Sequence, residues 1–267
     1  MDRDYWHKQT SDEPLFPDLL WSRPENKRQA GKLLIIGGNK FGFAAPAAAY
    51  QASLDAGIGR SKVLLPDALR KTVGQHLEAA EFAPTSPSGS FNRQALGEFL
   101  ELADWSDGVL LAGDLGRNSE TAILLESFFQ KYNGQLTITK DAVDYTYALA
   151  GVILSRANTT LVLSLSQLQK LARASGSPKP VTFSMDLLRL IDFLHEFTSQ
   201  HQVNIVVKHL DSIIVACGGK ISTTKTDTEL LVWRLDTASR TAVWNIQHPK
   251  ELFRSTTTAV TNPKLHM

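Results

Sequence analysis

The stretch "IIGGNKFGFAAPAAAYQASLDAGIG", residues 35–59, runs from an apolar strand through a glycine-containing turn into an alanine-rich helix. Gly37, Gly38 and Gly42 lie between the predicted strand and helix, so backbone N–H groups at the helix start can face an anion. A turn that serves only the close packing of strand and helix produces the same pattern. The stretch therefore predicts a strand–turn–helix unit and leaves open whether it holds a phosphate-bearing ligand.

The glycine spacing excludes two phosphate-binding motifs. It is not G-x-G-x-x-G, and no G-K-S/T follows, so neither the dinucleotide fingerprint nor the P-loop is present. Asp67 lies beyond the second predicted strand, about where a ribose-binding acid would be. This weak Rossmann signal keeps a dinucleotide-binding oxidoreductase as one alternative.

Strand and helix signals alternate over the first two hundred residues. Apolar runs predict strands at 32–36, 61–65, 107–112, 135–139 and 159–164. This alternation predicts an α/β fold with a doubly wound, mostly parallel sheet and helices on both faces. Runs at 203–208 and 212–223 predict a short antiparallel edge, and helices follow at about 227–246 and 249–260. In such sheets, ligands bind beyond the carboxyl ends of the strands.

Serines mark the starts of three predicted helices. Ser119 is predicted to cap one helix, and Ser164 with Gln167 makes a capping box for 165–174. Ser184 is predicted to cap an amphipathic helix whose apolar face includes Leu187 and ends near Phe197.

Composition bounds the class of protein. Residues 1–30 read as an irregular lead-in, and no linker or repeat divides residues 31–267, which we expect to form a single domain. Twenty-eight Lys and Arg against 27 Asp and Glu give a net charge near +1, so we expect neither nucleic acid nor a membrane surface as partner. Cys217 is the only cysteine and reads as a small buried hydrophobe.

The N-terminal residues lack the apolar segment of a signal peptide, and no apolar run approaches the length of a membrane span. Together with the single cysteine, these features predict a soluble cytoplasmic protein.

With its flanks, residues 23–66, the opening stretch resembles the start of the ADP-dependent NAD(P)H-hydrate dehydratases of the ribokinase-like superfamily, relatives of the carbohydrate kinases. In that family a Gly-Ala pair starts an Ala-rich helix that ends Ala-Gly-Ala-Gly. Counting back from residues 56–59 places Ala44 and Ala45 on the pair, so Ala45 matches and Ala44 departs.

The resemblance continues in order over about residues 21–220. The segment "LLAGDLGRN" (110–118) is similar to the family's Gly-Pro-Gly-Leu-Gly turn: Leu115 and Gly116 match, while Asp114 stands where a glycine is expected.

The segment "TKDAVD" (139–144) is similar to the family's Asp-Ala-Asp-Ala-Leu-Asn, with Asp141 as the second acid and Thr139 in place of the first. The resemblance implies a ribokinase-like fold and a substrate site that includes Ala45, Gly116 and Asp141.

The segment "KHLDS" (208–212) is similar to Lys-Gly-Ala-x-Thr, which contacts the nucleotide in the family; Lys208 is kept and Ser212 replaces Thr. The resemblance implies that Lys208 and Ser212 bind ADP or ATP, that Mg²⁺ assists, and that the substrate is hydrated NADH or NADPH. In that family, phosphate is transferred to the hydrate's hydroxyl and then eliminated, and the resemblance implies the same reaction here. No histidine pair has metal-ligand spacing, so no structural metal site is predicted.

Two segments depart from the family. The Thr-Pro-His-Pro-Gly-Glu loop corresponds to "SLSQLQKL" (164–171), which lacks the His, the prolines and the glycine. The Gly-Gly-Thr-Gly-Asp turn corresponds to "ISTTKTDTELLVW" (221–233), where only Thr226 and Asp227 remain. The resemblance makes Asp227 the candidate catalytic base, but a Thr-Asp pair before a helix is equally an ordinary N-cap, which we favour.

Three functions therefore stand as hypotheses. The first is an ADP- or ATP-dependent dehydratase that repairs hydrated nicotinamide cofactors, with lost or weakened activity because the glycine turn is missing. The second is a non-catalytic nucleotide-binding relative, and the third is the oxidoreductase suggested by Asp67. Trp233 and Trp244, at packing spacing on a predicted helix, indicate core packing or a subunit contact, so a homo-oligomer is a further possibility.

Overall fold

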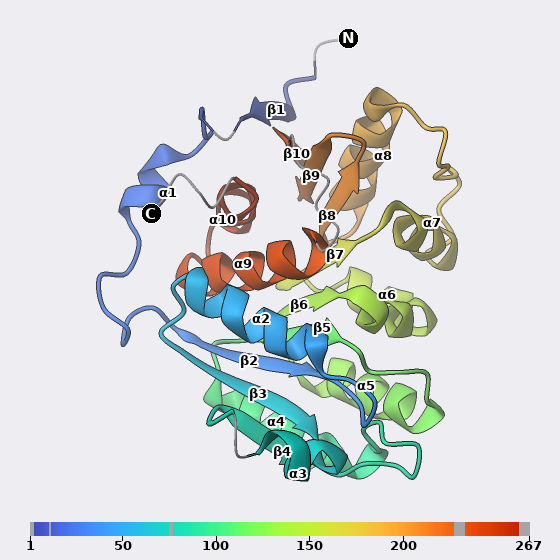
Figure 1. Ribbon diagram of the computed structural model, residues 1–267. Coiled ribbons are helices and arrows are strands. Elements are labelled where there is room, and N and C mark those ends of the chain that lie inside the picture. Colours follow the sequence, from blue (N-terminus) through green and yellow to red (C-terminus); the bar gives the residue numbers. More distant parts are fainter. Residues whose placement is uncertain (1–2, 11, 75–76, 227–232, 262–267) are drawn as a thin grey trace.

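The computed structural model describes residues 3–10, 12–74, 77–226 and 233–261 (Figure 1). The strands of these residues form one ten-stranded sheet with the order β1-β10-β9-β8-β7-β6-β5-β2-β3-β4. Their bounds are β1 (Trp6–Gln9), β2 (Lys32–Gly37), β3 (Arg60–Pro66), β4 (Ala80–Ala83), β5 (Gly108–Gly113), β6 (Gln135–Thr139), β7 (Thr159–Leu163), β8 (Asn204–His209), β9 (Ser212–Cys217) and β10 (Lys220–Lys225).

Most of the sheet is parallel. The strands from β4 through β3, β2, β5, β6 and β7 to β8 all pair in parallel. The pairs β8–β9 and β9–β10 are antiparallel. Gly218 and Gly219, both with positive φ (54° and 79°), make the tight turn between β9 and β10. The predicted parallel sheet with an antiparallel end is confirmed.

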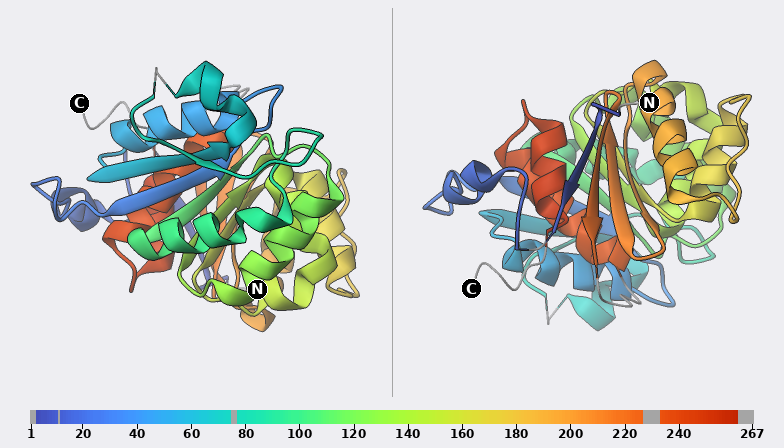
Figure 2. Two further views of the ribbon diagram at one scale, coloured as in Figure 1. Left: turned by 90° about the horizontal axis from the view of Figure 1, so that it is seen from below. Right: turned by 90° about the horizontal axis from the view of Figure 1, so that it is seen from above.

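Helices cover both faces of the sheet (Figures 1 and 2). One face carries α2 (Ala44–Asp55), α9 (Trp233–Gln247) and α10 (Leu252–Ala259), and the other carries α4 (Leu96–Trp105), α5 (Ser119–Lys131), α6 (Ala150–Leu154), α7 (Leu165–Ala174) and α8 (Leu187–Gln200). The short elements are α1 (Pro17–Trp21), α3 (Arg70–Val73) and the 3₁₀ helices η1 (Asp67–Leu69), η2 (Arg93–Ala95) and η3 (Lys140–Leu149).

Alternate residues of each central strand face the two helical layers. In β2, Leu34 and Ile36 belong to the core cluster that includes Phe99, whereas Leu33 and Ile35 belong to the opposite cluster. These four side chains are fully buried. A strand covered on both faces must be apolar at consecutive positions, which is why the central strands appear in the sequence as continuous apolar runs.

The N-terminal segment is not irregular throughout, because β1 extends the sheet in parallel beyond β10 (Figure 2). The Gln9 side chain donates to Thr224 Oγ1 at 2.7 Å and to the Thr257 carbonyl at 2.8 Å, which fixes the strand to α10. Arg3 donates two hydrogen bonds, of 2.7 and 2.8 Å, to the Asp192 carboxylate on α8. These long-range contacts, rather than local propensity, order the segment.

Two of the three predicted helix caps are displaced by one or two residues. The N-cap of α5 is Asn118, not Ser119, because the Asn118 side chain accepts the backbone N–H of Glu120. The N-cap of α8 is Asp186, not Ser184, and its carboxylate accepts the N–H of Arg189. The capping box at the start of α7 is confirmed.

No helix within the described ranges combines the length and the apolar character that a bilayer crossing requires.

The thiol of Cys217 provides a test of the core beside β9. Cys217 is 6% exposed and its thiol donates to Asn204 Oδ1 at 2.6 Å. Burial raises the pKa of the thiol to about 12, so very little reactive thiolate exists at neutral pH. We predict no alkylation by iodoacetamide at pH 8 in the folded protein and complete alkylation in urea, measured by mass spectrometry. Rapid labelling of the folded protein would contradict this packing.

Candidate functional site

The carboxyl ends of β2, β5, β6, β7 and β8 lie at one edge of the sheet, because these strands pair in parallel. The arrowheads of β2 and β3 mark this edge in Figure 1. The loops that follow these strands gather there, and ligands of doubly wound sheets bind at such edges.

The side chain of Asp141 organises the turn after β5. Its carboxylate accepts three backbone N–H bonds, from Asp114 at 2.7 Å, Leu115 at 2.9 Å and Gly116 at 3.2 Å. Burial raises the pKa of Asp141; the amide bonds oppose this rise, and the nearby Asp114 carboxylate adds to it. The bonds join the loop after β6 to the turn after β5, so Asp141 fixes the backbone of residues 114–116.

Asp114 connects this turn with the start of α2. One carboxylate oxygen accepts the backbone N–H of Ala45 at 2.7 Å, and the other accepts Lys140 Nζ at 3.0 Å. A negative charge is favoured at a helix N-terminus. The sequence analysis left open whether the start of this helix binds an anionic ligand. In the structure, the amide of Ala45 at this position binds a carboxylate of the chain itself.

The three predicted substrate residues lie in one hydrogen-bonded network. Asp141 binds the amide of Gly116, and Asp114 binds the amide of Ala45. Asp114 was a departure from the family pattern in the sequence, and its role as the connecting residue was missed. The signal available in the sequence was an acid directly after a strand, at a position where a glycine is expected. Asp can replace glycine there because it tolerates the left-handed conformation that Asp114 adopts, with a φ of 57°.

A cavity of about 600 Å³ adjoins the network. Its size is within the range of small-molecule sites. The walls come from the turn after β5, from η3 and from α7: Gly116, Arg117, Asn118, Asp141, Asp144, Tyr145, Tyr147 and Lys170. The Tyr145 hydroxyl donates to the Gly116 carbonyl and the Tyr147 hydroxyl donates to Asp144 at 3.0 Å. Two of the predicted substrate residues, Gly116 and Asp141, thus border this cavity.

Gln167 joins three elements beside the cavity. Its amide nitrogen donates to the Lys140 carbonyl at 2.7 Å, and its carbonyl oxygen accepts from the Ser164 amide at 3.1 Å and from Arg234 Nη1 at 2.9 Å. The side chain is only 6% exposed. The segment that replaces the family's histidine loop therefore ties η3 and the first described turn of α9 to the start of α7.

The predicted nucleotide residues lie at the same edge, where β8 turns into β9. Lys208 is half-buried near the end of β8, and Ser212 begins β9. Ser212 is 8% exposed and its hydroxyl donates to Asp211 at 3.1 Å, so this hydroxyl is already engaged. Strands β6 and β7 separate β8 from the turn after β5. Asp227 lies outside the described residues, and its two interpretations stay predictions.

Within the described ranges, no three His, Cys, Asp or Glu side chains come together in a group that could hold a metal ion.

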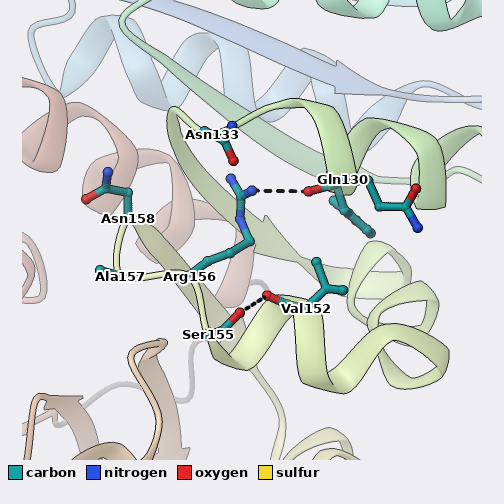
Figure 3. Close-up of a pocket in the computed structure, with 8 residues that line it drawn as sticks. Gln130, Asn133, Val152, Ser155, Arg156, Ala157 and Asn158 are labelled. Carbon is teal, nitrogen blue, oxygen red and sulfur yellow. Dashed lines mark hydrogen bonds between the residues drawn. The ribbon is translucent and has the colours of Figure 1, made fainter.

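A second cavity, of about 420 Å³, lies at the other end of the parallel strands, near the amino ends of β6 and β7 (Figure 3). Arg156 extends into it and donates to the carbonyls of Phe129 (3.2 Å), Tyr132 and Gly134 (3.3 Å). Burial lowers the pKa of this guanidinium, which stays charged. Because Arg156 binds carbonyls at and beyond the end of α5, we assign this region a structural role.

Comparisons with known proteins agree with this architecture. No family model matches the chain. Two curated relatives are bifunctional NAD(P)H-hydrate repair enzymes. The one from Methanocaldococcus jannaschii is 34% identical over 123 residues, which is 44% of this chain and 23% of the relative. The one from Methanothermobacter thermautotrophicus is 33% identical over 97 residues, 36% of this chain and 18% of the relative. The chain thus spans less than a quarter of the length of the curated relatives it matches.

Solved structures resemble the fold over nearly the whole chain. A ribokinase-like superfamily protein from Enterococcus faecalis superposes with a TM-score of 0.73 at 14% identity, covering 97% of this chain and 87% of the other. The ADP/ATP-dependent NAD(P)H-hydrate dehydratase from Bacillus subtilis, co-crystallised with ATP and Mg²⁺, gives a TM-score of 0.60 at 14% identity, covering 95% and 87%.

The chain has the ribokinase-like α/β fold, as the sequence resemblance implied. Over less than half of its length, it is similar in sequence to NAD(P)H-hydrate repair enzymes.

Gly113 tests the packing of the turn. A Cβ at Gly113 would lie 2.6 Å from Asp141 Oδ1 and 2.7 Å from Lys140 Cβ, and its φ of +97° disfavours any other residue. We predict that Gly113→Ala lowers the free energy of unfolding by about 1–3 kcal/mol, measured by urea denaturation. Gly97→Ala is the matched control, since a Cβ at that position in α4 meets nothing within 4 Å. Equal stability of the two variants would contradict the geometry.

Proposed function

We propose that the protein binds hydrated NADH or NADPH in the cavity beside Asp141, binds ADP or ATP beside Lys208, and acts as an NAD(P)H-hydrate dehydratase with weak turnover. One observation carries the proposal. The three residues that the resemblance assigns to the substrate, Ala45, Gly116 and Asp141, are joined in one network next to a cavity of about 600 Å³. The curated relatives, named as NAD(P)H-hydrate repair enzymes, support the choice of substrate.

The residues proposed to bind the nucleotide match that role less well than the resemblance implies. In the proposed reaction the nucleotide supplies the phosphate that is transferred to the hydrate and then eliminated. The ammonium group of Lys208 suits a phosphate, but the Ser212 hydroxyl already donates to Asp211. Mg²⁺ keeps several waters and binds mainly through substrate phosphates and one or two carboxylates, so we propose that it enters with the nucleotide.

Weak turnover is proposed because the segment 221–233 contains no glycine. A glycine-free turn makes the close approach of backbone amides to a phosphate harder. The same observation favours a second candidate, a non-catalytic relative that binds the hydrate or the nucleotide without turnover. The oxidoreductase alternative gains no support from the comparisons, and the Asp67 carboxylate accepts a hydrogen bond from Thr85. The expected cytoplasmic location, the absence of nucleic-acid and membrane partners, and a homo-oligomeric state stay predictions.

Substitution of Lys208 tests the nucleotide site. Loss of one charge-assisted contact to a phosphate is expected to weaken ADP or ATP binding about tenfold in Lys208→Ala, measured by calorimetry with and without Mg²⁺. Lys220→Ala is the control, because Lys220 is an exposed lysine at the far end of the β9–β10 hairpin. Nucleotide affinity that is the same in Lys208→Ala as in the wild type would refute the assignment.

Substitution of Asp227 tests the catalytic role. If Asp227 is an N-cap, Asp227→Ser leaves stability and turnover nearly unchanged, because serine caps a helix about as well. We expect this result, together with slow turnover of hydrated NADH by the wild type with either ADP or ATP. Fast wild-type turnover that drops by roughly 10² or more in Asp227→Ser would instead identify Asp227 as the base.

A further inference from the structure

Two cations border the cavity from elements on either side of η3. Arg117 belongs to the turn after β5, and Lys170 lies on α7, which follows β7. Since β6 lies between β5 and β7 in the sheet, η3 lies between the two segments. Both side chains are exposed and both line the cavity. The cavity therefore has a positive charge on each of two walls.

The two carboxylates that line the cavity accept hydrogen bonds from the protein itself. Asp141 accepts three backbone amides, and Asp144 accepts the Tyr147 hydroxyl at 3.0 Å and the Gln167 amide at 3.4 Å. Within the described part of the chain, neither Arg117 nor Lys170 lies within 4.0 Å of a carboxylate oxygen. Lys170 Nζ lies 6.0 Å from the centre of the Tyr147 ring. With no ion pair among these residues, each cation can pair directly with a negatively charged group of a ligand.

The two tyrosines add an aromatic wall. Tyr145 and Tyr147 are half-buried, and their hydroxyls bind the Gly116 carbonyl and Asp144. Their hydrogen-bonding groups are thus occupied by the protein, which leaves ring surface as cavity lining. Cations beside aromatic rings suit a ligand that combines phosphate with a planar ring.

We propose that Arg117 and Lys170 bind a phosphate of the dinucleotide itself, as distinct from the phosphoryl group transferred to it, and so select phosphorylated ligands over the nucleoside. This inference rests on the proposed substrate. A guanidinium can donate two parallel hydrogen bonds to a phosphate, and an ammonium group acts beside it as a compact charge. The bridging diphosphate and the 2′-phosphate of NADPH share this chemistry.

Calorimetry at 0.15 M salt tests the proposal with four ligands: hydrated NADH, hydrated NADPH, ADP-ribose and hydrated dihydronicotinamide riboside, which carries the same neutral ring without a phosphate. The variants are Arg117→Ala and Lys170→Ala. The matched controls are Arg28→Ala and Lys250→Ala, two exposed cations near the amino end of β2 and after α9, away from the cavity. Each cavity variant is expected to weaken binding of the phosphorylated ligands about tenfold and to leave binding of hydrated dihydronicotinamide riboside unchanged. The controls should bind like the wild type.

The ligand series separates the two phosphate sources. Equal losses for hydrated NADH, hydrated NADPH and ADP-ribose identify the diphosphate, whereas a loss confined to hydrated NADPH identifies the 2′-phosphate. Wild-type-like binding of every ligand by both variants overturns the inference and leaves the proposed substrate standing. If ADP-ribose binds in a manner that depends on Arg117 and Lys170 while neither hydrate binds, the phosphate site stands and the proposed function falls. If the wild type binds none of the four ligands, both are refuted.

Discussion

The acceptance of three backbone amides by the carboxylate of Asp141 is the constraint on which the site depends. Asp141 follows β6 and the amides follow β5, so these bonds hold the ends of two adjacent strands together. They fix the position of Gly116 and, through Asp114, the start of α2. Gly113 is required beside them because a side chain there would meet the Asp141 carboxylate.

The network also explains two unusual backbone conformations. Asp114 and Lys140 are non-glycine residues in the left-handed region, with φ of 57° and 53°. Such conformations are unfavourable unless the surrounding structure compensates for them. Here the ion pair of 3.0 Å between the two side chains, and the bond from Ala45 to Asp114, provide that compensation. Because the Asp114 carboxylate already accepts the amide at the start of α2, we propose that the dinucleotide phosphates bind elsewhere, between Arg117 and Lys170.

The sequence predicted the central strands well, because sheets covered on both faces require continuous apolar runs. It missed β1 and β4, which are four-residue strands at the two edges of the sheet, each with only one buried residue. The resemblance pointed to Ala45, Gly116 and Asp141, which the structure joins in one network, and their role in binding substrate stays a prediction. It did not reveal that Asp114 binds Ala45 or that Arg234 binds Gln167, because these partners lie 69 and 67 residues apart and only the fold brings them together.

A crystal structure of the protein soaked with hydrated NADPH tests the central claim most directly. We expect the dinucleotide in the cavity between residues 116–118, η3 and Lys170, with the Asp141 carboxylate still bound to the amides of residues 114–116. A dinucleotide bound beside Arg156, near the amino ends of β6 and β7, would contradict this placement. Rotation of Asp141 away from the turn to meet the ligand would contradict it as well.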